Sequence, residues 1–302
     1  MKQIVVLSGK GGTGKTSVTA SFAQLASQQS SLKAVFADAD VDAANLELVL
    51  APQQKSTEPF IGGKLAVLDL DLCSGCGLCE QACRFDAFLQ GPDGLEVDPI
   101  SCEGCAACVY VCPHGAIHME DQVAGEWSRS DSRYGPLLHA NLFPAQENSG
   151  KLVTLIKQQA RLLALDSGAD LLLVDGPPGI GCPVISAVSG ADFALVVAEP
   201  TASGVHDMQR VLETTHHFGV KAAVCVNKSD IYPEGFEAIK AYCEAQKLPL
   251  LGTIPFDLQV THAMVQGEPV TAFAPESAAA AAIRGVWESV MTWMGLEGNR
   301  HA

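Results

Sequence analysis

The sequence predicts a doubly wound α/β fold with a mainly parallel sheet, interrupted by a small inserted α+β domain. Short apolar runs alternate with helix-length segments at both ends of the chain, as in a parallel sheet with helices on both faces. A glycine-rich turn joins the first apolar run to the first helical segment. The alternation stops between about Ala51 and Ser149, where Pro, Gly and Cys dominate.

Local patterns predict the individual elements. The apolar run Ile4–Leu7 is typical of a buried parallel strand, and Lys15–Gln29 after it suits a helix. Ala34–Ala37 predicts the next strand. After the interruption, Lys151–Leu165 and Ala279–Met294 repeat apolar residues at helical spacing. Further strands are expected at Leu171–Val174, Phe193–Ala198, Ala222–Val226 and Leu250–Ile254.

Composition limits the function classes. A formal charge of −15 argues against a nucleic-acid-binding surface, which needs clustered Lys and Arg. The first apolar run is too short for a signal peptide, and no run of about eighteen apolar residues predicts a membrane-spanning helix. The 11 cysteines then indicate a reducing compartment, where thiols bind metals or are buried. The expected location is the cytoplasm.

The glycine-rich turn has the sequence of a phosphate-binding loop. GKGGTGKTS, Gly9–Ser17, follows a strand and opens a helix, which is the context that this motif requires. Its backbone N–H groups and the helix N-terminus favour phosphate oxygens. Lys15 should reach the β- and γ-phosphates, and the Thr16 hydroxyl should ligate Mg²⁺. The loop residues expected to bind nucleotide are Gly11, Gly12, Thr13, Gly14, Lys15, Thr16 and Ser17.

Eight cysteines form two copies of one pattern. C-x2-C-x2-C-x3-C spans Cys73–Cys83 and again Cys102–Cys112, which is the bacterial ferredoxin spacing for two [4Fe–4S] clusters. Three cysteines of one loop hold a cluster, and the fourth reaches the other cluster. The first cluster is therefore assigned to Cys73, Cys76, Cys79 and Cys112, and the second to Cys102, Cys105, Cys108 and Cys83.

Alternatives and departures accompany this assignment. Zinc ribbons pair two C-x2-C units, which a third and fourth cysteine at this spacing do not fit. Arg84 follows Cys83 where the ferredoxin pattern prefers proline. Clusters with a purely structural role remain an alternative to electron relay. Among the other cysteines, Cys225 is expected in the core and Cys243 on a helix. The role of Cys182 stays open between a cluster ligand and a small buried residue.

Lys10 extends the phosphate-loop motif to a family. A lysine directly after the first glycine, in GKGG, resembles the deviant P-loop of the MinD, ParA, Mrp and nitrogenase iron protein group. The resemblance implies that Lys10 reaches the nucleotide of a partner subunit, so that hydrolysis depends on dimerisation. DADVDAANLEL, Asp38–Leu48, resembles the switch I segment of this group. It implies that Asp40 positions the attacking water and that Asp38 lies close to Mg²⁺.

Three later segments resemble the same group. In LLLVDGPPGIG, Asp175 would support Mg²⁺ and Gly179 would approach the γ-phosphate. Asn227 in VNKSD, and Pro255 and Asp257 in IPFD, would lie beside the base. Both Asp40 and Asp175 could instead cap helices. NKSD also resembles a guanine-reading motif, so ATP is the preferred nucleotide and GTP the alternative.

Together these motifs predict the organisation and function. Residues 1–58 and 150–302 would form one ATPase domain, 60–120 an inserted ferredoxin domain, and 121–149 a linker. The expected protein couples a dimer-dependent ATPase cycle to electron transfer through two [4Fe–4S] clusters, as a homodimer or with a similar ATPase. Its redox partner is not identified. The alternatives are an iron–sulfur carrier or assembly ATPase, and a positioning ATPase with the ferredoxin as docking module.

Overall fold

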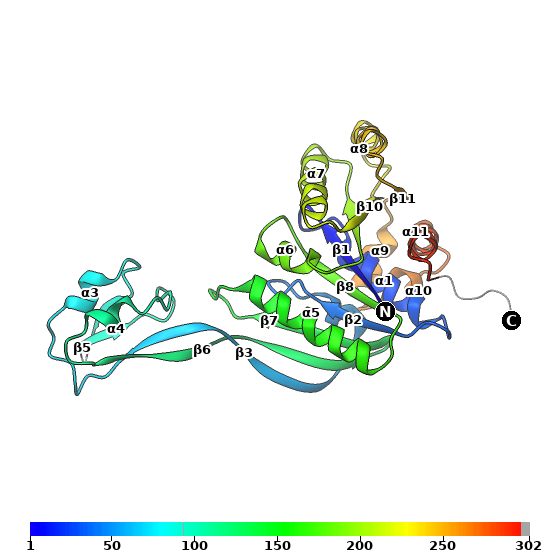
Figure 1. Cartoon of the computed structure of the whole chain (residues 1–302). Coiled ribbons are helices and arrows are strands. Elements are labelled where there is room, and N and C mark those ends of the chain that lie inside the picture. Colours follow the sequence, from blue (N-terminus) through cyan, green and yellow to red (C-terminus); the bar gives the residue numbers. More distant parts are fainter. Residues whose placement is uncertain (93, 297–302) are drawn as a thin grey trace. The chain divides into compact units, whose positions relative to one another are not determined.

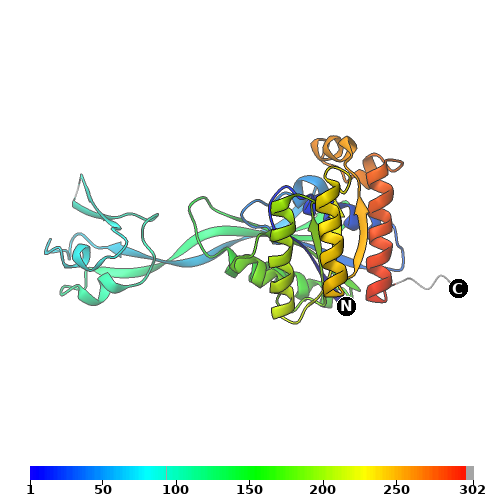
Figure 2. The ribbon, with the colours of Figure 1, turned by 90° about the horizontal axis from the view of Figure 1, so that it is seen from above.

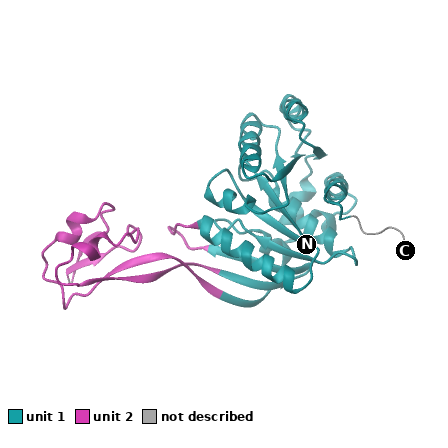
Figure 3. Ribbon diagram, in the orientation of Figure 1, with its two compact units in different colours: residues 1–57, 127–141, 149–302 teal, residues 58–126, 142–148 magenta. Residues whose placement is uncertain are grey.

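The computed structural model describes residues 1–92 and 94–296 (Figure 1). The chain divides into two compact units (Figure 3): residues 1–57, 127–141 and 149–302 form the first, and residues 58–126 and 142–148 form the second. We call them the nucleotide-loop unit and the cysteine unit.

The strands of the main sheet are β1 (Lys2–Ser8), β2 (Ala34–Asp38), β3 (Gln53–Leu68), β6 (Ile117–Ser132), β7 (Gly135–Leu142), β8 (Leu171–Pro178), β9 (Phe193–Ala198), β10 (Lys221–Asn227) and β11 (Leu250–Ile254). Within the described residues this sheet has nine strands, in the order β11-β10-β9-β1-β8-β2-β7-β6-β3. The pairings from β11 to β7 are all parallel. The predicted mainly parallel α/β fold is confirmed.

Helices cover both faces of the parallel strands in the nucleotide-loop unit. They are α1 (Lys15–Ser27), α2 (Leu46–Leu50), α5 (Ser149–Asp166), α6 (Cys182–Val188), α7 (Ala202–His217), α8 (Pro233–Gln246), α9 (Leu258–Val265), α10 (Val270–Phe273) and α11 (Ala278–Met294). Helices α7, α8 and α11 lie with nearly aligned axes (Figure 2). Within the described residues 1–92 and 94–296, none of the helices is long and apolar enough to cross a membrane.

The alternating side chains of β1 explain why both faces need helices. Ile4 and Val6 belong to a core that also contains Phe22 of α1 and Trp287 of α11, whose ring centroids lie 5.0 Å apart. The side chains between them, such as Val5, are equally buried. A strand that is apolar on both sides is typical of a covered parallel sheet. Each fully buried aliphatic side chain stabilises the fold by about 1.5–3 kcal/mol.

The segment predicted to be a linker, residues 121–149, instead contains most of two strands. β7 pairs in parallel with β2, so that Leu137 lies opposite Phe36, and Leu137 is fully buried. The inward positions of β6 include the buried Ser128 and Ser130. Because these inward side chains are polar, the apolar alternation that marks a strand is missing from the sequence.

Hydrogen bonds of this segment explain how it buries polar groups. Ser130 Oγ lies 3.0 Å from His139 Nε2, and His139 Nδ1 lies 2.6 Å from Glu47 Oε2. The hydrogen bond from His139 lowers the pKa of Glu47, although burial opposes this. His139 is 7% exposed, so its partners lie inside the fold rather than at a catalytic surface. The trio joins α2 to β6 and β7.

The cysteine unit has its own small core. It contains α3 (Leu78–Ala82), β4 (Phe88–Gly91), β5 (Gly94–Val97) and α4 (Ala107–Val111), and parts of β3 and β6. β4 and β5 pair antiparallel. The core consists of Ala66, Cys79, Phe88, Cys108 and Ile117, with further cysteines packed against it. Thiols therefore take the place that aliphatic side chains hold in a larger domain.

Candidate functional site

The parallel topology gathers polar residues at one edge of the sheet. The glycine-rich loop follows β1, Asp38 ends β2, and Asn227 ends β10. Asp175 lies in β8, paired with Asp38 of β2, and Glu199 directly follows β9. Ligands of open α/β sheets bind at the carboxyl ends of the strands, so this edge is the candidate nucleotide site.

The loop itself is held from β10. Gly14, the N-cap of α1, has a left-handed backbone, φ +91°, and a Cβ there would collide with the amide of Asn227. That amide donates to the carbonyl of Thr13 at 2.7 Å. Lys228 Nζ lies 3.1 Å from the carbonyl of Gly12. The hydroxyl of Thr13 is buried without a hydrogen-bond partner among the described residues, and a bound phosphate would supply one.

Lys15 and Asp175 lie at the centre of the site. Lys15 is 5% exposed, and its Nζ lies 3.0 Å from Asp175 Oδ1 and 3.4 Å from Asp40 Oδ2. Thr16 donates to Asp175 Oδ2 at 2.7 Å, and Thr19 donates to Asp175 Oδ1 at 2.8 Å. The structure thus brings together four residues predicted for phosphate, Mg²⁺ and water, with Asp38 beside them.

The charges of this cluster do not balance. Burial, and after it the nearby Asp175, raise the pKa of Asp38 to about 8, although Lys15 opposes them. Burial also raises the pKa of Asp40. Burial alone would lower the pKa of Lys15, but Asp175, Asp40 and Asp38 raise it above its usual value. Three carboxyl groups face one ammonium, and the ionisation of Asp38 and Asp40 is opposed, so the donor set fits an added divalent cation with oxygen ligands.

Gly179 lies next to the phosphate loop. It follows β8 with φ +90°, and its N–H donates to the carbonyl of Ser8 at 2.9 Å. Ser8 is the last residue of β1, directly before the loop. This contact places the backbone of the glycine predicted to approach the γ-phosphate against the start of the phosphate loop. A γ-phosphate contact remains a prediction.

Lys10 is paired within its own chain. Its Nζ lies 2.7 Å from Glu199 Oε1 and donates to the hydroxyls of Thr201 and Ser203, each at 3.2 Å. Lys228 Nζ lies 3.1 Å from Glu199 Oε2. Burial opposes ionisation of Glu199, but hydrogen bonds from both lysines lower its pKa.

Sequence reasoning missed Glu199. The available signal was an acidic residue directly after the apolar run Phe193–Ala198, because that position reaches the same sheet edge as Asp38 and Asn227 in a parallel sheet.

The predicted base-side residues have structural partners. Asp257 caps α9: its Oδ1 accepts from Gln259 N at 2.9 Å, and its Oδ2 accepts from Ala279 N at 3.2 Å. Asp230 Oδ1 accepts from Phe256 N at 2.7 Å. Pro255 connects β11 to these residues. Contacts of Asn227, Pro255 and Asp257 with a base stay predictions.

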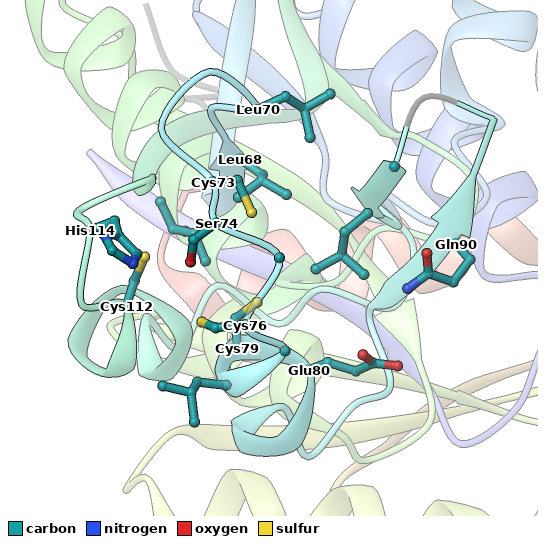
Figure 4. Close-up of a pocket in the computed structure, with 16 residues that line it drawn as sticks. Leu68, Leu70, Cys73, Ser74, Cys76, Cys79, Glu80, Gln90, Cys112 and His114 are labelled. Atoms are coloured by element: carbon teal, nitrogen blue, oxygen red, sulfur yellow. The ribbon is translucent and has the colours of Figure 1, made fainter.

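In the cysteine unit, the predicted ligand sets line two separate cavities. A cavity of about 360 Å³ is lined by Cys73, Cys76, Cys79 and Cys112, which lie around one space in Figure 4. A much smaller cavity of about 20 Å³ is lined by Cys83, Cys102, Cys105 and Cys108. Each cavity therefore combines three cysteines of one motif with the last cysteine of the other.

The two motifs share one backbone path. Gly75 and Gly77 are left-handed in the first, and Gly104 and Ala106 take the corresponding positions in the second. Each motif then makes a short helix, α3 or α4, and ends in an extended cysteine. An alanine in this conformation costs about 1 kcal/mol or more, and its residue type gives no hint of the turn.

The thiols surround the cavities rather than converge on a point. Among residues 1–92 and 94–296, no three His, Cys, Asp or Glu side chains are grouped to hold a single metal ion. A [4Fe–4S] cluster takes its cysteine ligands on separate irons, so its ligands are spread around a cage. Hydrogen bonds from the N–H groups of His114 and Ala116 lower the pKa of Cys112, and burial raises the pKa of Cys79 and Cys108.

The remaining cysteines lie in the nucleotide-loop unit. Cys225 is fully buried in β10, and burial raises its pKa to about 12. Cys243 is buried in α8. Cys182 is exposed at the start of α6. Cys225 is therefore a core residue and Cys243 a helix residue, as predicted, and the side chain of Cys243 is also buried.

A glycine-rich loop between the first strand and helix of a parallel sheet, with a buried lysine and carboxylates, defines a P-loop nucleotide-binding protein. Residues 4–270 match the CobQ/CobB/MinD/ParA nucleotide binding domain family, and the chain belongs to that family.

Relatives and solved structures agree with this class. The uncharacterized protein MJ0578 of Methanocaldococcus jannaschii is 34% identical over 258 residues, covering 85% of this chain and 86% of the relative. The uncharacterized ATP-binding protein MJ0547 of the same organism is 29% identical, covering 93% and 84%. The septum site-determining protein MinD of Pyrococcus horikoshii, complexed with Mg-ADP, superposes with a TM-score of 0.59 at 21% identity, covering 99% of both chains. That likeness shows the MinD-type fold.

Proposed function

We propose that this chain is a cytoplasmic Mg²⁺-dependent ATPase whose hydrolysis depends on dimerisation, and whose cysteine unit is an inserted ferredoxin domain with two [4Fe–4S] clusters for electron transfer. One observation carries the second half of the proposal. The eight thiols line two cavities in two sets of four, and these are the sets expected from ferredoxin spacing.

The nucleotide half rests on the loop and the charge imbalance beside it. The backbone of Gly11–Gly14, with Lys15 and Ser17, binds the phosphates. Thr16, Asp38 and Asp175 hold Mg²⁺, which neutralises phosphate charge when bound. Asp40, 3.4 Å from Lys15, orients the attacking water. Gly179 approaches the γ-phosphate, and Asn227, Pro255 and Asp257 lie beside the base.

Dimerisation enters through Lys10. Its side chain is 31% exposed, so a second subunit, either an identical chain or a similar ATPase, can receive it. Lys10 then contacts the nucleotide of the partner and stabilises the charge that develops on the phosphate during transfer.

Electron transfer is the activity that ferredoxin-type thiol sets support. A [4Fe–4S] cluster held by four thiolates supplies a one-electron redox couple. The cysteine unit contributes the thiolates. It also contributes the backbone N–H of Ala116, which donates to Cys112 Sγ at 3.3 Å. Such hydrogen bonds tune the potential of a cluster.

Anaerobic voltammetry of the reconstituted protein, with and without Mg-ATP, tests the coupling. We expect two cluster signals, at least one of which shifts in potential or rate with ATP, and no ATP effect in Lys10→Ala. Cluster signals that ignore ATP, together with transfer of iron and sulfide to an apoprotein, would indicate an iron–sulfur carrier. ATP hydrolysis that is the same with and without clusters would indicate a positioning ATPase that uses the cysteine unit for docking.

A further inference from the structure

Glu199 holds two lysines that border the phosphate loop. Its Oε1 lies 2.7 Å from Lys10 Nζ, and its Oε2 lies 3.1 Å from Lys228 Nζ. Lys228 also contacts the carbonyl of Gly12 in the loop at 3.1 Å. The side chain of Glu199 is 11% exposed, whereas those of Lys10 and Lys228 are 31% and 30% exposed. A shielded carboxylate therefore lies between two cations that reach solvent.

We infer that Glu199 is a positioning residue that keeps Lys10 on its own subunit until a nucleotide-loaded partner binds. The inference rests on the proposed action of Lys10 on the partner's nucleotide. Lys10 cannot serve the partner while its ammonium is held by Glu199, Thr201 and Ser203 of its own chain. Dimerisation must therefore break these contacts, and their strength sets part of its free energy.

The second lysine on Glu199 lowers the free-energy cost of releasing Lys10. A buried carboxylate that loses its sole partner is strongly destabilised. Glu199 avoids this, because Lys228 stays on its other oxygen when Lys10 leaves. Oε1 also keeps a hydroxyl neighbour, Thr201, whose Oγ1 lies 3.4 Å away. Glu199 can thus pair with two lysines before Lys10 leaves and with Lys228 alone afterwards, so its carboxylate is never left unpaired.

Lys228 is suited to remain rather than leave. Its backbone N–H donates to Asn227 Oδ1 at 3.0 Å, and the amide of Asn227 holds the carbonyl of Thr13. The ammonium of Lys228 therefore contacts the phosphate loop directly, and its backbone is linked to the loop through the side chain of Asn227. The ammonium of Lys10, by contrast, contacts Glu199, Thr201 and Ser203, which lie outside the loop. In a two-fold dimer both subunits would release Lys10 together.

Glu199→Gln tests the inference, with ATPase activity measured against protein concentration at saturating Mg-ATP. The amide introduced by this substitution still accepts hydrogen bonds but no longer forms an ion pair with Lys10. Two part-exposed ion pairs no longer need to break per dimer, so we expect half-maximal activity at about threefold to thirtyfold lower protein concentration. Asp131→Asn, which breaks an exposed carboxylate–lysine pair with Lys55 in the same unit, is the control and should leave the midpoint unchanged.

Two further variants separate the possible results. Glu199→Asp keeps the buried charge but retracts it, and should shift the midpoint in the same direction even if Glu199→Gln impairs folding. Lys10→Ala with Glu199→Gln should match Lys10→Ala alone, because Glu199 acts through Lys10. A midpoint that stays put or rises in both Glu199 variants, while Lys10→Ala is inactive, overturns the role of Glu199 only. Full activity of Lys10→Ala overturns the proposed function and the inference together.

Discussion

Thr16 Oγ1 donates a hydrogen bond to Asp175 Oδ2 across 2.7 Å, joining the first turn of α1 to β8. One turn further along the same helix, Thr19 donates to the other oxygen of Asp175 at 2.8 Å. Two chemically identical groups thus hold one carboxylate, but only Thr16 belongs to the phosphate-loop motif. Comparing Thr16 with Thr19 therefore separates the role of Thr16 in nucleotide binding from the contribution that a hydrogen bond to Asp175 makes to the fold.

Thr16→Val and Thr19→Val should therefore have different effects. Thr16→Val removes a proposed Mg²⁺ ligand, and we expect Mg²⁺-dependent nucleotide affinity to fall about tenfold to hundredfold. Thr19→Val removes a buried hydrogen bond to Asp175 and should lower the free energy of unfolding by about 1 kcal/mol while nucleotide affinity is kept. Calorimetric titration with Mg-ADP, beside denaturant unfolding, measures both quantities. Equal losses of affinity would contradict the assignment of Thr16.

The buried Asp38 predicts a pH dependence of the nucleotide-free protein. Its pKa is raised from 3.8 to about 8, so the native state holds a proton that the unfolded chain has released. Stability from this group is therefore lost as the pH rises from about 4 to 8, at up to about 1.4 kcal/mol per pH unit. Urea unfolding across this range should show the slope, and saturating Mg²⁺ with nucleotide should reduce it.

Asp38→Asn is the matching variant for that slope. The two carboxylate oxygens accept N–H groups from Asp40 and Leu46, and an amide keeps only one acceptor. The overall stability of Asp38→Asn should thus fall, but its dependence on pH between 4 and 8 should flatten. A slope as steep as that of the parent protein would assign the effect to other groups.

The sequence predicted the nucleotide-loop unit well because its strands are apolar on both sides. Ile4–Leu7 and Leu171–Val174 needed no tertiary information, since a continuous apolar run between turn signals has few alternatives. The strands of residues 121–149 were missed because their inward positions include Ser128 and Ser130, whose burial depends on partners far away in sequence. The burial of His139, which is the partner of Ser130, likewise could not be predicted from the residues beside it in sequence.

The candidate sites show the same division. Spacing alone predicted which cysteines share a cavity, because a short motif constrains local geometry. Lys10 and Glu199 lie far apart along the chain, and their pairing requires the parallel order β9-β1 that places both residues at one edge. The left-handed Ala106 was unpredictable for another reason, since alanine carries no preference for that conformation.

Replacing Lys157, which lies outside both sites, should lower the stability of the fold. It is 7% exposed, and its ammonium donates to the carbonyls of Ser186, Ala187 and Ser189 at 2.6–2.7 Å, at the C-terminal end of α6. Lys157→Met leaves these carbonyls without that donor, so the free energy of unfolding should fall by about 2–4 kcal/mol. Arg161→Met, one turn away on the exposed face of α5, should change it by less than about 0.5 kcal/mol. Denaturant unfolding of both variants measures this difference, and similar losses in the two variants would contradict the role of Lys157.

The two cysteine cavities predict which thiols act together. Cys112 lies in the second motif but lines the cavity of Cys76, and Cys83 lies in the first motif but lines the cavity of Cys105. After anaerobic reconstitution, Cys112→Ala and Cys76→Ala should lose the same cluster, whereas Cys83→Ala and Cys105→Ala should lose the other. Each variant should fall from about eight iron atoms per chain to about four, with matching electron paramagnetic resonance spectra within each pair. Cys225→Ala, a buried thiol in the other unit, should keep both clusters. If Cys112→Ala and Cys105→Ala instead lost the same cluster, each cluster would be held by the four cysteines of one motif. The cavities would then not define the ligand sets.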